Sequence, residues 1–334
     1  MAGNWDKAAR SFRSELTDAV PAETLRALHR IAPWRHALVV LRQLVILAAA
    51  VTVILLWGDL WYAWIPASIV IGFVVFGFIV LVHEVVHEVV VSDRKSRWHR
   101  ILGHAYALPS GVAYDQFHRW HLDHHDELGT DDDDPKRAYL SPKRRSRLVK
   151  ALYFTPALFP IYFRAARRAA ANYPAELKQR IAWQRRAAIG FHLAVAGLLW
   201  WQLGWVLMLK LHVLPVFFVF PVAFTINRLG QHYDIDPDDP AAWGTLMRPS
   251  PLLWDHLFLW SNYHIEHHYF PRVPMYNLPR LHAELRPFFE KHGMRERTYG
   301  GLLWDWFVRN RAPHTNWSAA PKGTFEAEAP GPIL

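Results

Sequence analysis

Four apolar segments, each long enough to cross a lipid bilayer, constrain the fold of this chain more than any other feature of its sequence. They run from about residue 38 to 57, 60 to 82, 187 to 209 and 211 to 229. About 20 apolar residues in a helix span the hydrocarbon core of a bilayer, so we expect four transmembrane helices. Short turns join the first to the second and the third to the fourth. The sequence therefore predicts an all-α integral membrane protein built from two helical hairpins.

The distribution of basic residues predicts which ends of the helices face the cytoplasm. The turns near Asp59 and Lys210 carry one basic residue between them, whereas the N-terminal segment, residues 92–186 and the C-terminal third are rich in arginine and lysine. By the positive-inside rule, these three regions and both termini lie in the cytoplasm. We expect a multi-pass protein of a bacterial cytoplasmic membrane. The net charge of +9 then reflects contact with membrane lipids, and no nucleic-acid partner is expected.

The same pattern divides the chain into three regions. Residues 1–35 are expected to form a cytosolic, amphipathic lead-in, residues 36–310 the membrane domain, and residues 311–334 a disordered tail with several prolines. Residues 148–163 are apolar, contain Pro156 and Pro160 and are flanked by arginines. This composition favours a helix that lies in the interface of an anionic membrane, with a re-entrant segment as the alternative.

Histidines gather in three clusters just outside the apolar segments. The first is H-x-x-x-H at residues 83–87, and H-x-x-H-H occurs at residues 121–125 and again at 264–268. Histidines three or four positions apart share one face of a helix, which suits imidazoles that reach a common metal. The chain has no cysteine, so histidine or carboxylate must hold any redox metal. The clusters contain eight imidazoles, more than one metal can bind: His83, His87, His121, His124, His125, His264, His267 and His268.

Acidic residues beside these clusters are candidates to orient the ligands, because a metal-bound histidine needs a partner for its second ring nitrogen. Glu84, Glu88, Asp123 and Glu266 lie within or next to the clusters. The acidic run at residues 131–134 is interpreted as a solvated loop. Isolated histidines, among them His282, are interpreted as polar anchors near the membrane surface.

The three clusters together resemble the histidine boxes of the membrane-bound fatty acid desaturase and hydroxylase superfamily. The string NYHIEHHYFP at residues 262–271 is especially similar to the third box of that family, and the resemblance covers about residues 35 to 290. His232, at the end of the fourth apolar segment, is similar to an additional metal-binding histidine of the family. The resemblance implies nine ligands: His83, His87, His121, His124, His125, His232, His264, His267 and His268.

The resemblance also implies a shape and a chemistry. Four spans would form a stem, and a cytosolic helical cap would enclose two iron ions that activate O2 against an unactivated C–H bond of a lipid acyl chain. No dinucleotide fingerprint, haem-binding domain or cysteine-rich ferredoxin module is visible in the sequence. Electrons are therefore expected from a separate donor, either a ferredoxin or a cytochrome b5 with its reductase.

Several functions remain open at this point. Within the superfamily, a fatty acyl or sphingolipid desaturase comes first, and a lipid, carotenoid or alkane hydroxylase is the alternative. Residues 83–87 also match the H-E-x-x-H pattern of zinc proteases, which leaves the other two clusters without a role. A membrane protein that stores or carries metal is the non-catalytic alternative, although such a protein would favour ionisable residues within its spans.

Overall fold

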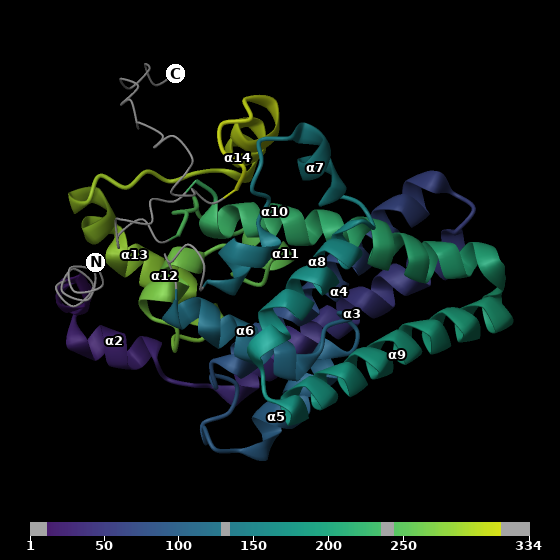
Figure 1. The fold of residues 1–334 in the computed structure, drawn as a ribbon, viewed down its shortest axis with the longest axis horizontal. Helices are drawn as coiled ribbons and strands as arrows, with labels where there is room; N and C mark the ends of the chain where they lie inside the picture. The colour runs from purple at the N-terminus through teal and green to yellow at the C-terminus, as the bar shows by residue number, and fades with distance from the viewer. Residues whose placement is uncertain (1–11, 128–133, 235–243, 315–334) are drawn as a thin grey trace.

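The computed structural model describes residues 12–127, 134–234 and 244–314. Within these ranges the chain is helical, apart from an isolated β-bridge between Met247 and Arg297, so the expectation of an all-α fold is confirmed there. Figure 1 shows long helices running side by side along one part of the molecule and shorter helices gathered at the other. The shorter helices surround the ends of the long ones.

The labelled helices vary from three to 34 residues in length. In chain order they are α2 (Ala22–Leu28), α3 (Pro33–Trp57), α4 (Trp61–Val86), α5 (Arg97–Ala107), α6 (Tyr114–Asp126), η1 (Lys136–Leu140), α7 (Arg147–Leu152), α8 (Leu158–Ala169), η2 (Ala170–Asn172), α9 (Ala175–Met208), η3 (Leu209–Val219), α10 (Phe220–His232), α11 (Trp254–Leu257), α12 (His264–Tyr269), η5 (Met275–Asn277), α13 (Leu278–Lys291), α14 (Tyr299–Leu303) and η6 (Trp304–Val308).

Three helical runs in the described residues are long and apolar enough to cross a membrane: Pro33–Trp57, Trp61–Val86 and Ala175–His232. The first two correspond to α3 and α4 and match the first two predicted segments, each with a few additional residues. Pro33 begins α3, where its missing N–H is not needed by the helix. The extra turn at the end of α4 carries His83, and His87 follows the helix as its C-cap.

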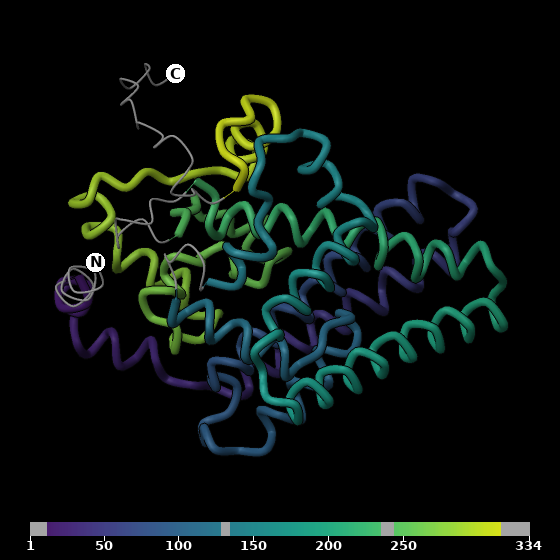
Figure 2. The backbone as a smooth tube through the Cα atoms, in the orientation of Figure 1, coloured from purple at the N-terminus to yellow at the C-terminus, as the bar shows by residue number. Residues whose placement is uncertain are grey.

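The third run contains 58 residues and covers both remaining predicted segments. Its backbone leaves the helical region at Gly204, where φ is +81°, a conformation that glycine adopts without steric cost. Figure 2 shows the chain running outward along α9 and returning through η3 and α10. The rings of His192 and His212, one from each limb, lie 5.2 Å apart.

The turn of this second hairpin therefore lies at Gly204 and not near Lys210, as the sequence suggested. Lys210 is part of the returning helix, where its Nζ donates to the carbonyl oxygen of Gly58 at 2.7 Å and lies over the ring of Trp64. The lysine thus joins the second hairpin to the turn of the first. Hydropathy did not locate the reversal because apolar residues continue through it on both sides.

The ends of the chain are more closely attached to the fold than expected. Phe12 and Leu16, in the predicted lead-in, are buried, and the ring of Phe12 packs edge-on against Tyr269 and Phe288. At the other end, Ala312 and His314 are buried although they fall in the expected disordered tail. The rest of that tail, residues 315–334, lies outside the described residues.

The predicted interfacial helix at residues 148–163 is divided into two short helices. α7 ends at Leu152, a turn follows, and α8 begins at Leu158. Pro156 lies in this turn, and its lack of an N–H is one reason why a single helix does not run through it. Both helices present apolar and basic side chains, and whether they rest on a membrane stays a prediction.

The apolar core that positions the histidines lies at the C-terminal end of α4. Leu81, Val82 and Val85 are 0–1 % exposed and pack in one apolar cluster with Leu229 and Ile265. This cluster draws together the ends of α4 and α10 and the start of α12. The histidine-bearing turns are therefore supported by rigid packing and not by a flexible loop.

Candidate metal centre

Every candidate histidine lies in or directly beside a helix that packs on this core. His83 is in the last turn of α4 and His87 follows that helix as its C-cap. The second cluster lies on α6, the third on α12, and His232 is the last residue of α10. Four helices distant in sequence thus bring their histidines to one place.

The nine candidate imidazoles form two groups, and within each group the possible ligand atoms all lie within 4.8 Å of one another. The five-histidine group consists of His83, His87, His121, His125 and His267. The four-histidine group consists of His124, His232, His264 and His268. The two groups adjoin, since the rings of His125 and His268 stack with centroids 4.3 Å apart.

The spacing within each cluster determines which group a histidine joins. In both H-x-x-H-H clusters, the histidines four positions apart share a group: His121 with His125, and His264 with His268. The histidine at position i+3, His124 or His267, joins the opposite group. This follows from helix geometry, because positions i and i+4 lie about 40° apart around the axis whereas i+3 lies on the other side of i. Each of these clusters therefore links both groups.

The ring nitrogens face one another closely. Nε2 atoms are separated by 2.7 Å between His87 and His121, 2.8 Å between His232 and His264, and 3.0 Å between His124 and His232. Burial lowers the pKa of His124 and His267 well below its usual value, and neighbouring charged groups lower it further. Neutral imidazoles that offer a lone pair are the form that binds iron, zinc or copper, so the donor set suits two transition-metal ions.

Asp134 supports the four-histidine group, contrary to the interpretation of residues 131–134 as a solvated loop. It is 3 % exposed, and its Oδ1 lies 2.9 Å from Nδ1 of His124. Burial raises the pKa of Asp134 to about 6, while the ammonium of Lys136 opposes this shift. A carboxylate at this position orients the ring and makes its other nitrogen a better ligand. Residues 131–133 lie outside the described residues.

The carboxylates suggested by sequence contribute less directly. Glu84 lies 3.7 Å from Nδ1 of His83, and its Oε2 accepts a hydrogen bond from the backbone N–H of Met275 at 2.9 Å. Glu266 is fully buried and pairs at 2.5 Å with His282, which is therefore not a surface anchor. Asp123 pairs with an arginine and accepts from a tyrosine, away from the nine histidines. The structure gives Glu88 no such contact with a histidine.

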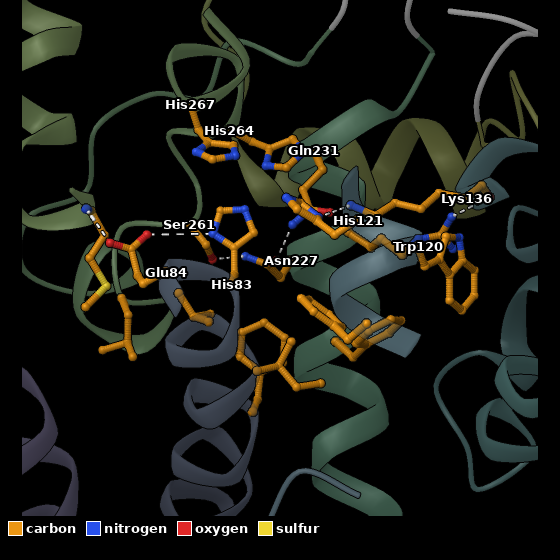
Figure 3. A pocket seen from close by; sticks show the side chains of 18 of the residues that line it. His83, Glu84, Trp120, His121, Lys136, Asn227, Gln231, Ser261, His264 and His267 are labelled. Atoms are coloured by element: carbon orange, nitrogen blue, oxygen red, sulfur yellow. Dashed lines mark hydrogen bonds and ion pairs between the residues drawn. The ribbon is translucent and has the colours of Figure 1, made fainter. Parts of the chain in front are cut away.

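A cavity lies directly against the histidines (Figure 3). His83, His121, His264 and His267 form part of its wall. The remainder is mainly apolar and comes from α4, α6, α8, α10 and the segments around α12: Phe76, Ile79, Val80, Phe117, Trp120, Leu140, Tyr162, Phe224, Leu259, Met275 and Leu278. An aliphatic chain placed here would be out of water and beside both groups.

Three polar residues of this wall were not singled out by sequence. Lys136 follows Asp134 closely and places Nζ 3.4 Å from Nδ1 of His121. Asn227 donates to the hydroxyl of Ser261 at 2.8 Å, and Gln231 donates to Asn227 at 2.9 Å. Asn227 and Gln231 precede His232 by five residues and one residue, so their place near the end of α10 was the available signal. His118, in the same helix as the second cluster, joins neither group.

Known proteins with similar sequences indicate the family to which this chain belongs. The chain is 27 % identical over 255 residues to an acyl-lipid 8-desaturase of Rebecca salina, a match that covers 67 % of this chain and 56 % of that protein. It is 26 % identical over 232 residues to the sphingolipid delta(4)-desaturase/C4-monooxygenase DES2 of Homo sapiens, covering 67 % of this chain and 66 % of that protein. The matches thus span between about half and two thirds of these relatives. A sequence model described as fatty acid desaturase matches residues 59–300, most of the chain and all three histidine clusters. This protein therefore belongs to the fatty acid desaturase family.

Proposed function

We propose that this protein is an O2-dependent, di-iron oxidoreductase that oxidises an unactivated C–H bond of a lipid acyl chain, acting as a fatty acyl or sphingolipid desaturase. One observation carries the proposal: two adjoining groups of buried and partly buried imidazoles lie against a mainly apolar cavity, which histidines from both groups line. The names of the two relatives, an acyl-lipid and a sphingolipid desaturase, support a lipid substrate.

The nine histidines of the two groups are the proposed ligands, one iron ion to each group. Bound iron would supply the activation of O2 and the removal of hydrogen from carbon. The residues of the chain hold the imidazoles in place, as Asp134 does for His124 at 2.9 Å. The apolar wall orients the acyl chain and excludes water, so proximity and desolvation provide the protein's part of the catalysis.

The reaction determines which other partners are needed. Desaturation takes two hydrogen atoms from adjacent carbons, together with O2, two electrons and two protons, and yields an alkene and two waters. Hydroxylation uses the same reactants, places one oxygen atom in the C–H bond and yields an alcohol and one water. Both begin at one C–H bond, which is why hydroxylation is the alternative activity. We assign the electrons to a separate ferredoxin, or to a cytochrome b5 with its reductase.

Four membrane passes are part of the proposal. A continuous helix of 58 residues would be about 87 Å long, far more than the roughly 30 Å hydrocarbon core. The reversal at Gly204 divides this run into two limbs, each long enough for one pass. With α3 and α4 this makes two hairpins, so we assign both termini and the histidines to one side of the membrane and, from the distribution of basic residues, to the cytoplasmic side.

The test is expression in a desaturase-deficient host, with mass spectrometry of total lipids and iron measured on the purified protein. We expect an unsaturated lipid product, about two irons per chain, and no product without O2. His124→Ala and His267→Ala should each abolish the product, whereas His118→Ala, from the same helix as His124 but in neither group, should retain it. Full activity in His124→Ala would refute the di-iron assignment. One zinc per chain with O2-independent proteolysis would replace it with a zinc protease.

A further inference from the structure

One end of the cavity beside the histidines carries two cationic side chains, a partly buried lysine and a buried arginine. Lys136 and Arg228 both line the cavity together with apolar and aromatic side chains. Arg228 is 8 % exposed, and its guanidinium donates to the hydroxyl of Ser141 at 2.8 Å and reaches the carbonyl oxygen of Lys136 at 3.5 Å. Figure 3 shows Lys136 and Trp120 at one side of the cavity and Glu84 at the other. The cavity is therefore polarised along its length.

These cations lack a full set of local counter-charges. No carboxylate in the described part of the chain lies within ion-pair distance of the Lys136 ammonium or the Arg228 guanidinium. Asp134 is the nearby acid, but its Oδ1 already accepts from His124 and from the backbone N–H of Lys136 at 2.9 Å each. Glu84, the other acid of the cavity, faces Met275 and His83 at the opposite end. Charges buried without partners are costly, and bound metal ions would add further positive charge nearby.

The same end also has a hydrogen-bond donor without a partner. Trp120 is 4 % exposed, and its indole N–H has no hydrogen-bond partner among the described residues. An ammonium, a guanidinium and an indole N–H are all donors, and none of them accepts a hydrogen bond. The ligand that satisfies them must therefore be an acceptor, and an anionic oxygen satisfies both their charge and their hydrogen bonds.

We infer that the Lys136–Arg228 end of the cavity binds the carboxylate of an unesterified fatty acid, whose hydrocarbon chain then lies along the apolar wall beneath the histidines. The inference rests on the proposed function and specifies its substrate class. It also orients the substrate. Since Nζ of Lys136 is 3.4 Å from His121, the bond that is oxidised lies closer to the carboxyl end than to the methyl end of the chain.

The experiment measures binding without turnover. Radiolabelled stearate and methyl stearate are titrated into the iron-loaded, full-length protein in phosphatidylcholine nanodiscs, with no reductant present. The wild-type protein should bind stearate at least tenfold more tightly than methyl stearate. Lys136→Met should reduce this preference to about one while leaving methyl stearate binding and iron content unchanged. Lys95→Met removes an exposed lysine elsewhere and should leave the preference intact.

Each other result contradicts the inference. Equal binding of stearate and methyl stearate by the wild type, or an unchanged preference in Lys136→Met, excludes the carboxylate site. A third result would be that stearate and methyl stearate bind equally well while sodium phosphate still reduces stearate binding. The cationic end would then hold a small anion and not the lipid. Lys136→Arg keeps the charge and should keep both iron and the preference. Loss of iron in both Lys136→Met and Lys136→Arg would make Lys136 a positioning residue for His121 and would overturn its role in substrate binding. None of these measurements needs O2-dependent product, so the inference can fail while the proposed function stands.

Discussion

The two histidine groups have similar chemistry but unequal support. The five-histidine group has one imidazole more, and both histidines of the first cluster belong to it. The four-histidine group has fewer imidazoles, but Asp134 holds His124 through a hydrogen bond of 2.9 Å. In the five-histidine group, the carboxylate of Glu84 lies 3.7 Å from His83 and accepts a hydrogen bond from the backbone N–H of Met275. The five-histidine group thus has more candidate ligands, whereas the four-histidine group has fewer, one of which is oriented by a carboxylate.

The first prediction removes one imidazole from each group and has the largest expected effect. His232→Ala leaves the four-histidine group with three imidazoles, whereas His125→Ala leaves the other group with four. We expect the His232→Ala protein to contain about one iron per chain. Its activity should fall by more than about 100-fold, a larger loss than removal of an outer-sphere partner causes. His125→Ala should retain close to two irons. Elemental analysis of protein purified from membranes measures this, and equal iron loss in both variants would remove the asymmetry.

The second prediction weakens orientation while keeping every ligand. Asp134→Asn preserves the side chain's size but replaces the carboxylate beside His124 with a neutral amide. We expect metal affinity at the four-histidine group to fall by about 10- to 100-fold, measured by competition with a chelator. Asp123→Asn is the matched control, because Asp123 lies near the same cluster but pairs with Arg119 at 2.8 Å. An Asp134→Asn protein that releases iron no faster than this control would show that the hydrogen bond is not needed.

The third prediction applies the same change to the five-histidine group. In Glu84→Gln the amide oxygen can still accept from the N–H of Met275, and no hydrogen bond to His83 is lost, because the distance of 3.7 Å is too long for one. Removal of an outer-sphere partner that orients a ligand lowers metal affinity by roughly tenfold or more. We therefore expect Glu84→Gln to lower metal affinity by less than this. Chelator competition on both variants compares the groups directly. A loss as large as that of Asp134→Asn would mean that Glu84 orients His83 when metal is bound.

Eight of the candidate histidines could be singled out from the sequence because spacing along a helix is a local property, whereas His232 was added only by the resemblance to the family. What the spacing did not reveal was the division into groups, since that depends on how α6 and α12 face each other across the core. Asp134 was missed because residues 131–134 are four identical aspartates, and nothing in the local sequence distinguishes Asp134 from the other three. His282 was misread for a similar reason: its partner, Glu266, is 16 positions away and is brought close only by the packing of α13 on α12.

The hairpins show the same limit at a larger scale. The apolar segments predicted from hydropathy fall within the three long apolar helical runs of the described residues, because the total apolar content of a span does not depend on its neighbours. The turn of the second hairpin was placed near Lys210 because a charged residue between two apolar segments usually marks a boundary. The reversal depends instead on the backbone freedom of Gly204, and Lys210 is accommodated by the carbonyl of Gly58 and the ring of Trp64. The position of this turn thus depends on contacts between residues far apart in the sequence, which the local charge at Lys210 does not indicate.

The last prediction concerns a lysine outside the metal centre and has the smallest expected effect on it. Nζ of Lys150 is buried and donates to the carbonyl oxygens of Trp306 and Ala312 and to Oδ1 of Asn310, at 2.6, 2.7 and 2.7 Å. Lys150→Met leaves these acceptors without their donor, so we expect a loss of about 1–3 kcal/mol of stability, seen as a lower Tm in detergent. Lys178→Met, which removes an exposed lysine with one backbone hydrogen bond, should leave the Tm nearly unchanged.

This substitution also distinguishes the two groups. Lys150 holds the segment that contains Ala312 and leads to His314, and the carbonyl oxygen of His314 accepts from the backbone N–H of Asp234, two residues beyond His232. Loosening this segment should therefore affect the four-histidine group first. We expect chelator to remove one of the two irons somewhat faster from Lys150→Met than from the wild type, with the second iron unaffected. Equal acceleration for both irons would mean that this segment stabilises both groups alike, and that the asymmetry between the groups comes from their ligands alone.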